Sequence, residues 1–249
     1  MLDTIKDIYS VFWVDLRNLR HHWRSAIVTS LVQPLLYLVA FGYGLGGGVR
    51  IGEVSYLAFV IPGIVALTSF STSFNGAASK LQIDRFFYKS FDELLISPVS
   101  LYSIVAGKTL IGTLRGSISS IAILLVGMFL MPTLEVSPLF LLALFVSCFV
   151  FSLFGVFIAL VIDSHHGMST FNNLVILPMT FLCGTFFSLN ELPEPAKVAL
   201  YILPLTHASQ SLRAAALGYP FPWLSLLVLA GFGIAFFVGC IVALRKTSV

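Results

Sequence analysis

The sequence has 249 residues, of which 58% are hydrophobic and only 10% are charged. Soluble domains average about 45–50% apolar and about 25% charged residues, so this composition excludes an ordinary soluble domain. The net charge of +3 comes from dispersed basic residues, which excludes the concentrated basic patch of a nucleic-acid-binding protein. A mean hydropathy of +0.98 instead predicts an integral membrane protein.

Six stretches are long and apolar enough to cross a bilayer, which requires about 20 predominantly apolar residues each. They are Ser25–Gly44, Val54–Ser79, Val99–Met131, Pro138–Ile162, Thr170–Leu189 and Trp223–Leu244. We therefore expect an all-α polytopic membrane protein, with one transmembrane domain over residues 1–249. Spans one to five occupy residues 25–189 in this prediction, and span six occupies residues 223–244.

Lysine and arginine residues fall mainly on one side of the predicted spans. Ten of them lie near the N-terminus, the connection between spans two and three, or the C-terminus. Three lie on the opposite side, and Arg115 lies inside a span. Since basic flanks stay on the cytoplasmic side, both termini are predicted to be cytoplasmic, in a multi-pass protein of the cytoplasmic (inner) membrane.

The sequence offers no recognisable chemistry of its own. All eleven acidic residues lie outside the cores of the predicted spans, whereas a carboxylate at mid-membrane is the usual mark of a proton or sodium relay. No GxxxxGK[ST] phosphate loop, nucleophile–base pair or metal-ligand spacing is present. Cys148, Cys183 and Cys240 lie in apolar runs and are expected to be inert. We expect no catalytic residues, no metal site and no cofactor in this chain.

Residues 1–23 precede the first predicted span. Ile5, Tyr9 and Trp13 recur at helical spacing, and charged residues occupy most of the remaining positions. The segment lacks the apolar run and the cleavage site of a signal peptide. It therefore predicts an amphipathic helix in the cytoplasmic interface, with Trp13 and Trp23 at headgroup level. The alternative is a basic flank that merely orients span one.

The connection between spans two and three, residues 80–108, mixes acidic, basic and aromatic side chains. Pro98 is expected to end any helix there, because the residue before a proline is pushed out of the α region. A short helix with exposed aromatic residues is typical of an element that docks into a groove on a partner. The alternative is a connector that lies on the membrane.

Residues 190–222 are too apolar for a free loop but contain no span of their own. Pro193, Pro195 and Pro204 divide the segment, and Gly218 ends its last part. Irregular backbone at membrane depth must be shielded by protein or water. We therefore expect two short re-entrant helices that dip into the outer leaflet.

Two predicted spans carry polar stripes. Thr68, Thr72 and Asn75 lie on one face of span two, and span five carries a second set, Asn172, Asn173 and Thr180. These side chains could line a substrate pathway. They could equally hydrogen-bond between helices, as serine, threonine and asparagine often do in membranes.

Arg115 lies within span three, seven residues after Lys108 and therefore about 10 Å deeper along the helix. It could hold a phosphate of a lipid-linked substrate, extend to the cytoplasmic headgroups, or pair with a partner helix. Gly112 and Gly116 bracket it and predict a close approach by another helix.

Three stretches of the chain, in order, resemble a known family. They are "FVIPGIVAL" (Phe59–Leu67), "DELLISPVSLYSIVAGK" (Asp92–Lys108), and "FNNLVILPMTFLCGTFFSLNELP" (Phe171–Pro193) followed by "LPLTHASQSLRAAALG" (Leu203–Gly218). Together they resemble the ABC-2 type permeases, the membrane subunits of ATP-driven exporters. The resemblance extends over essentially the whole chain. The last pair of stretches is similar to the C-terminal hallmark of the family, seen in nodulation-factor, polysaccharide and drug exporter permeases.

This resemblance implies a homodimer that carries two copies of a separate ATPase subunit, which binds ATP and magnesium. The connection after span two would then insert into a cleft of the ATPase, and the N-terminal helix would brace the same partner. Glu93, Leu94 and Leu95 would be its central contacts. The full set that the resemblance assigns to ATPase coupling is Phe86, Phe87, Phe91, Asp92, Glu93, Leu94, Leu95, Ser97 and Pro98.

By the same resemblance, substrate would pass along spans two and five, between the protomers. The pathway residues would be Thr68, Thr72, Asn75, Asn172, Asn173, Thr180 and Arg115. Narrow polar stripes in otherwise apolar spans favour an amphiphile, such as a lipid-linked glycan, a lipid or a hydrophobic drug. The competing interpretations are an ATP-independent channel or ion-coupled carrier, an intramembrane enzyme, and a structural membrane anchor.

Overall fold

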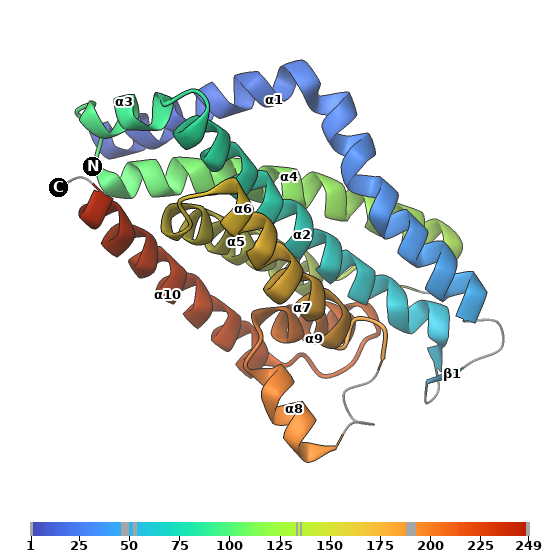
Figure 1. The fold of residues 1–249 in the computed structure, drawn as a ribbon. Coiled ribbons are helices and arrows are strands. Elements are labelled where there is room, and N and C mark those ends of the chain that lie inside the picture. The colour runs from blue at the N-terminus through green and yellow to red at the C-terminus, as the bar shows by residue number, and fades with distance from the viewer. Residues whose placement is uncertain are drawn as a thin grey trace.

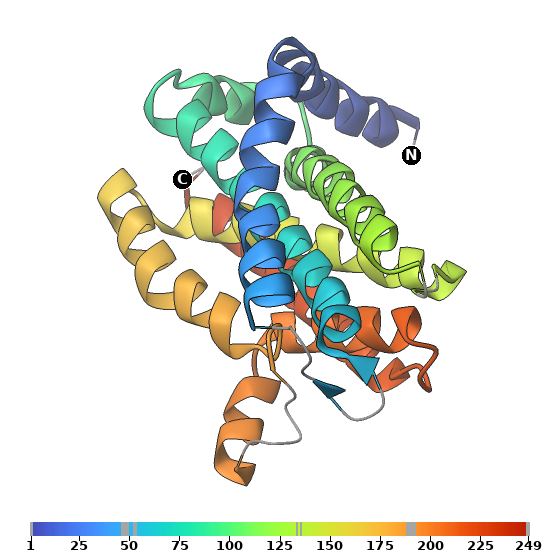
Figure 2. The same cartoon turned by 90° about the vertical axis from the view of Figure 1, so that its right-hand side faces the viewer.

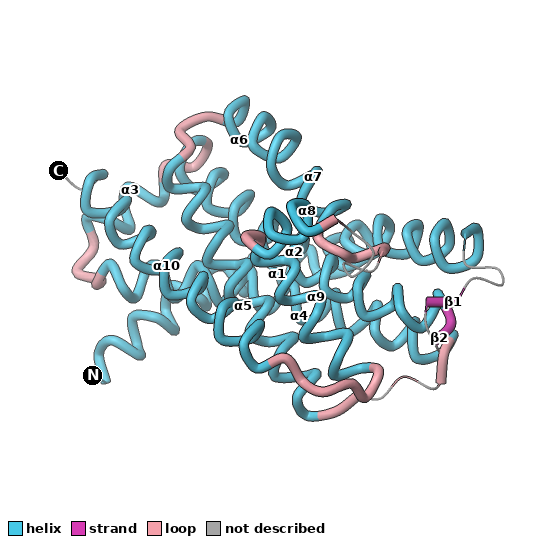
Figure 3. The backbone as a smooth tube through the Cα atoms, turned by 90° about the horizontal axis from the view of Figure 1, so that it is seen from below, coloured by secondary structure: helices cyan, strands magenta, loops and turns pink. Residues whose placement is uncertain are grey.

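A computed structural model describes residues 2–45, 50–51, 54–132, 134, 136–187 and 193–247. Nearly all of this chain is helical, which confirms the predicted all-α class (Figure 3). Strands β1 (Arg50–Ile51) and β2 (Val54–Ser55) form a short antiparallel pair. The helices are α1 (Leu2–Tyr37), η1 (Leu38–Leu45), α2 (Tyr56–Phe86), α3 (Ser90–Ile96), α4 (Leu101–Leu130), α5 (Pro138–Val161), α6 (His165–Phe171), η2 (Asn172–Ile176), α7 (Leu177–Leu182), α8 (Glu194–Tyr201), α9 (Pro204–Ala216) and α10 (Trp223–Thr247).

Within the described residues, five helices are long and apolar enough to cross a membrane. They are Trp23–Gly42, Tyr56–Phe86, Leu101–Leu130, Pro138–Val161 and Trp223–Lys246. They match five of the six predicted spans in position.

The remaining predicted span, Thr170–Leu189, differs from the structure. Three consecutive helical pieces, α6, η2 and α7, cover seven, five and six residues and end at Leu182. Gly184 then adopts a positive φ of 71°, a conformation that commonly follows a helix C-terminus. At 1.5 Å per residue the three pieces reach about 27 Å, slightly less than the roughly 30 Å of a bilayer core. Residues 188 and 189 lie outside the described residues.

The N-terminal helix is not separate from the first span. Helix α1 runs without a break from Leu2 to Tyr37 and bends, so that its first part lies across one end of the bundle (Figure 2). Val11 packs against Gly107 of α4, where a Cβ atom would lie 2.6 Å from a Val11 methyl carbon. Tyr9 and Trp13, by contrast, are exposed and stack on each other. One face of the N-terminal arm therefore packs on the bundle, and another faces outward.

Helix α2 is the centre of the fold and packs against α4, α5 and α9. Its residues Ile61–Phe70 are buried without interruption. The close approach predicted from Gly112 and Gly116 is confirmed, because a Cβ atom on either residue would overlap Ser73 or Ala77 of α2. Serine side chains cap the starts of α2, α4 and α5, where each accepts a hydrogen bond from the backbone N–H three residues later.

The segment after α7 contains two short helices, α8 and α9, as predicted for its described part. Almost all of α9 is buried. Arg213 fastens it to the start of α2: Nε donates to the Phe59 carbonyl at 3.2 Å, Nη2 donates to the Gly184 carbonyl at 2.8 Å, and the guanidinium stacks 3.7 Å from the Phe59 ring centroid. Burial lowers the pKa of Arg213 to about 10, which leaves it charged at neutral pH.

The two ends of the molecule differ. The start of α1, the end of α10 and helix α3 lie at one end, whereas β1 and α8 lie at the other (Figure 1). Helix α2 has 31 residues and is about 46 Å long, so it exceeds a bilayer core of roughly 30 Å. Its last turns lead directly into α3.

Candidate functional site

A cavity of about 500 Å³ lies between α1, α2 and α4. Ten of the residues that line it carry a hydroxyl, amide or guanidinium group. These are Ser25, Thr29, Ser30 and Gln33 of α1, Ser71, Thr72, Asn75 and Ser79 of α2, and Arg115 and Ser119 of α4. Leu19, Trp23, Ile27 and Ile118 add apolar surface. The cavity is therefore amphipathic, with hydrogen-bonding groups beside aromatic and aliphatic side chains.

The predicted pathway residues of α2 and α4 divide between the cavity and the protein core. Thr72, Asn75 and Arg115 line the cavity. Thr68 is fully buried and donates its hydroxyl to the Ile64 carbonyl at 2.7 Å, so it is not available to a ligand in this conformation. Asn75 is exposed and donates to the Ser71 carbonyl at 2.8 Å, which leaves its side-chain oxygen free to accept.

The second predicted stripe, on η2 and α7, does not line this cavity. Asn173 is exposed, and the Thr180 hydroxyl is used within its own helix, on the Leu177 carbonyl at 2.7 Å. Asn172 Oδ1 is buried and accepts no hydrogen bond from any described residue. Within this chain, therefore, the two polar stripes lie on separate surfaces.

Sequence reasoning missed the contribution of α1. Ser30 Oγ and Ser119 Oγ lie 2.8 Å apart and join α1 to α4 at the cavity wall. Ser25, Thr29 and Gln33 follow one another at intervals of four residues, so they share a helical face. That spacing was the signal available in the sequence, but a single polar face on an otherwise apolar span does not reveal which helix it meets.

Arg115 is the charged residue among those that line the cavity. Its side chain crosses towards α2, where a Cβ on Gly76 would lie 3.3 Å from Arg115 Cδ. It forms neither an ion pair nor a hydrogen bond with the described part of the chain. The guanidinium is thus half-buried beside polar groups, and no described residue supplies a counter-charge.

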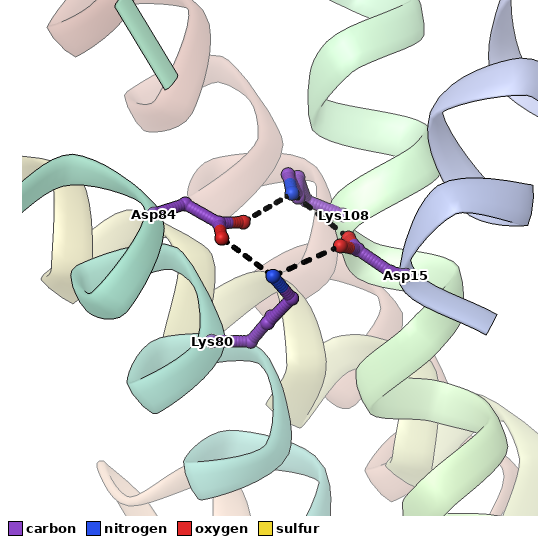
Figure 4. Close-up of polar contacts among 4 residues, drawn as sticks. All are labelled: Asp15, Lys80, Asp84 and Lys108. Atoms are coloured by element: carbon purple, nitrogen blue, oxygen red, sulfur yellow. Dashed lines mark hydrogen bonds and ion pairs between the residues drawn. The ribbon is translucent and has the colours of Figure 1, made fainter. Parts of the chain in front are cut away.

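A second feature is a ring of four charges, three of them buried and Lys80 half-buried (Figure 4). Lys108 Nζ lies 2.8 Å from Asp15 Oδ2 and 2.6 Å from Asp84 Oδ2. Lys80 Nζ donates to Asp84 Oδ1 and lies 3.4 Å from Asp15 Oδ1. Two acids and two bases alternate, so the ring, defined by Asp15, Lys80, Asp84 and Lys108, has no net charge.

This charge ring joins three helices. Asp15 comes from the N-terminal arm of α1, Lys80 and Asp84 from the last turns of α2, and Lys108 from the start of α4. Removing one partner of a buried ion pair leaves an uncompensated charge and typically costs about 3–5 kcal/mol. The ring therefore holds the helices on both sides of α3 to the N-terminal arm. The sequence signal was weak, because Lys80 and Asp84 at spacing i,i+4 look like an ordinary surface pair.

Helix α3 and its flanks hold the residues predicted to contact an ATPase. Asp92, Glu93 and Pro98 are exposed, as is Phe87, which is 69% exposed. Phe86 and Ser97 are half-buried, and Leu94 and Leu95 pack partly against the core.

Phe91 differs from these residues, because its ring is 2% exposed and anchors α3 to the bundle. Its assignment to ATPase coupling stays a prediction. Lys89, which precedes α3 with a φ of 52°, turns the chain sharply after α2.

The end of α2 is also tied to the end of α5. Arg85 Nη1 donates to the Ala159 and Leu160 carbonyls, and Nη2 lies 2.9 Å from Asp163 Oδ1. The two carbonyls belong to the last turn of α5, where backbone acceptors have no helical partner. The end of α2, which leads into α3, is therefore connected to α1 and α4 through the charge ring, and to α5 through Arg85.

Known proteins resemble this chain over most of its length. A family model described as ABC-2 type transporter matches residues 6–217. The inner membrane transport permease YadH of Escherichia coli (strain K12) is 28% identical over 244 residues, which cover 92% of this chain and 94% of that protein. Nodulation protein J of Rhizobium leguminosarum bv. trifolii is 28% identical over 208 residues, 80% of this chain and 78% of that protein. Nodulation protein J of Rhizobium meliloti (strain 1021) is 29% identical over 202 residues, 79% and 76% respectively.

Proposed function

Since the chain belongs to the ABC-2 type transporter family and is a multi-pass membrane protein, we propose that it is the permease subunit of an ATP-driven exporter. It moves an amphiphilic substrate outward across the cytoplasmic membrane, and a separate subunit binds ATP and magnesium and hydrolyses the ATP. The name of the Escherichia coli relative, an inner membrane transport permease, supports the choice of membrane.

In this proposal the chain spans the membrane six times, with α6, η2 and α7 as the fifth span. Both termini and α3 are cytoplasmic. Two observations support this topology: the start of α1, the end of α10 and α3 lie at the same end of the molecule (Figure 1), and most basic residues cluster there. A span of about 27 Å needs only slight thinning of the bilayer, at a modest cost in free energy.

The observation that carries the proposal is the exposed surface of α3 at the end of an overlong α2. Glu93 and Asp92 present charge, and Ile96, at 87% exposure, presents apolar surface. Phe91 fixes the other side of the helix in the core. A short helix anchored in this way can fill a groove on an ATPase and transmit its movement, because the charge ring and Arg85 connect it to α1, α4 and α5.

The assembly we propose contains two copies of the chain and two ATP-binding subunits. The face of η2 and α7 that carries Asn173, Leu174 and Leu177 is exposed in one protomer. A second copy would cover this face, and the stripe of η2 and α7 would then face the partner. Nucleotide drives transport only if it stabilises one membrane conformation more than the other.

The test is affinity purification of the tagged chain from its native membrane in a mild detergent. We expect an ATP-binding protein to co-purify, and we expect Glu93→Lys to abolish both the co-purification and ATP-driven transport in reconstituted vesicles. Glu194→Lys is the matched control, since Glu194 is an exposed acid on α8 at the opposite end of the molecule. Transport without any ATP-binding subunit, or equal behaviour of the two variants, would contradict the proposal.

A further inference from the structure

The cavity between α1, α2 and α4 contains a charge that none of the described residues neutralises. Arg115 has no counter-ion among the described residues, and the wall residues around it are uncharged. A half-buried cation that lies within a membrane span is costly, and such residues usually pair or mark a ligand pathway. The cost is offset if the cavity receives an anion.

The neighbouring charges do not compensate Arg115. The four charges of the ring sum to zero, and its two carboxylates are already held by Lys80 and Lys108. Lys108 is seven residues before Arg115, about 10 Å along α4. An anion in the cavity therefore meets one net positive charge.

The position of the side chain argues against a simple extension to the headgroups. Such an extension would run along α4 towards the membrane surface. Instead, Arg115 Cβ and Cδ pass close to Gly76 of α2, which has no side chain in the way. The glycine gives the arginine room to reach the cavity wall, where Thr72 and Asn75 also lie.

The remaining wall fits an amphiphile whose polar group is anionic. Hydroxyl and amide groups such as Ser30, Gln33 and Asn75 can bind ester or sugar oxygens, and Trp23 and Ile118 offer apolar surface at the same cavity. The volume of about 500 Å³ lies within the range of about 300–1,000 Å³ that is usual for small-molecule sites. A guanidinium fork binds phosphate oxygens in a bidentate manner.

We propose that this cavity binds an anionic phosphate group and that the Arg115 guanidinium is its main contact. This inference rests on the proposed function, because it makes the cavity a substrate subsite and narrows the amphiphile to one with a phosphate. Two sources share this chemistry: the headgroup of a lipid and a soluble phosphate.

The experiment uses the full chain, purified with the subunits that accompany it and placed in phosphatidylcholine nanodiscs. The lipid probes are phosphatidic acid, whose phosphate carries a net negative charge, and phosphatidylcholine, whose phosphate is neutralised by its choline. Both have the same acyl chains, which differ from those of the nanodisc lipid, and native mass spectrometry measures how much of each is retained. Inorganic phosphate is the soluble probe, measured by its effect on the melting temperature. We expect a preference for phosphatidic acid of about tenfold, equivalent to about 1.4 kcal/mol.

Three variants test the contact. Arg115→Gln is expected to abolish the preference, and Arg115→Lys to keep part of it, because an ammonium supplies charge without the fork. Asn75→Asp adds a carboxylate of the same shape to the wall and is also expected to abolish the preference, so the test stands even if Arg115→Gln fails to fold. Arg24→Gln is the control, since it removes the same charge from α1 next to the cavity without removing a wall residue.

Each outcome either supports the phosphate site or contradicts it. Binding of inorganic phosphate that depends on Arg115 and equals that of phosphatidic acid supports the site and identifies a soluble ligand. Equal retention of both lipids together with no Arg115-dependent effect of inorganic phosphate, or a preference that survives both Arg115→Gln and Asn75→Asp, overturns it. ATP-driven export without Arg115-dependent binding of either probe refutes this site and leaves the proposed function. Arg115-dependent binding by a chain that has no ATP-binding partner supports this site and refutes the proposed function.

Discussion

Gly116 and Gly112 show how single residues set the distance between the two central helices. A Cβ at Gly116 would overlap Ser73 Oγ, and one at Gly112 would meet Ser73, Ala77 and Ser152. The hydroxyl of Ser152 donates to the Thr109 carbonyl at 2.6 Å, which brings α5 to the same place. Helices α2, α4 and α5 therefore meet at small side chains, next to Arg115, which carries the charge in the cavity.

Gly116→Ala is expected to destabilise the protein by about 1–3 kcal/mol, because the added methyl group forces α4 away from α2. The matched control is Gly231→Ala on α10, where an added Cβ meets no atom within 4 Å. That variant should be neutral or slightly stabilising, since alanine has the higher helix propensity. Thermal unfolding in detergent, followed by size-exclusion chromatography, measures the difference. Equal melting temperatures for the two variants would contradict the packing argument.

Individual polar residues were harder to assign from the sequence than these glycines. The glycine spacing on α4 has one physical meaning, close packing, and the structure confirms it. The hydroxyl stripe on α2 has two meanings, and both occur: Thr68 bonds within its own helix, whereas Thr72 lines the cavity. One turn separates the two, and only the position of α1 distinguishes them.

Among the helices, the N-terminal arm of α1 is held to the bundle by one buried charged contact more than by its apolar face. Tyr9 and Trp13 are exposed, and Val11 and Asp15 are the buried residues of the arm. Asp15 places a carboxylate between Lys80 and Lys108. Without it, two ammonium groups would face Asp84 alone, which leaves a net buried positive charge.

Asp15→Asn is therefore expected to loosen the N-terminal arm from α2 and α4. Loss of one partner from a buried ion pair costs about 3–5 kcal/mol, so amide hydrogen exchange in the first turns of α1 should accelerate by at least about tenfold. Asp7→Asn is the control, since Asp7 lies on the same arm outside the charge ring. If exchange in the arm is the same in both variants, the ring does not hold the arm in place.

The positions of most helices could be predicted from the sequence, but the residues at which some of them begin and end could not. Hydropathy located the five long spans because each is a long apolar run, and the positions of Pro193 and Pro204 divided the outer segment correctly. The sequence also predicted a boundary between the N-terminal arm and span one, where the structure has one continuous helix. The composition changes there from polar to apolar, but such a change does not require the helix to break. The fifth span was also predicted to extend beyond Leu182, because Gly184 and the residues after it are apolar without being helical.

In the whole molecule, the features that suggest function arise from contacts between distant segments. The charge ring combines residues 15, 80, 84 and 108, and the cavity combines residues 19–33, 71–79 and 115–119. Each helix alone shows an unremarkable set of polar residues. The family resemblance could be recognised from short motifs, but the cavity could not, because its existence depends on the bend of α1 across α2 and α4.

The distribution of these features also makes the topology of the whole molecule testable. Cys148, Cys183 and Cys240 are buried, so the unmodified chain should react little with a membrane-impermeant maleimide. Asp92→Cys places an exposed thiol on α3, and Glu194→Cys places one on α8 at the opposite end (Figure 1). We expect Glu194→Cys to be labelled in intact cells, and Asp92→Cys only after the membrane is permeabilised. Labelling of Asp92→Cys in intact cells would place α3 outside the cell, where no cytoplasmic ATPase could bind it. That result would contradict the proposed coupling role of α3.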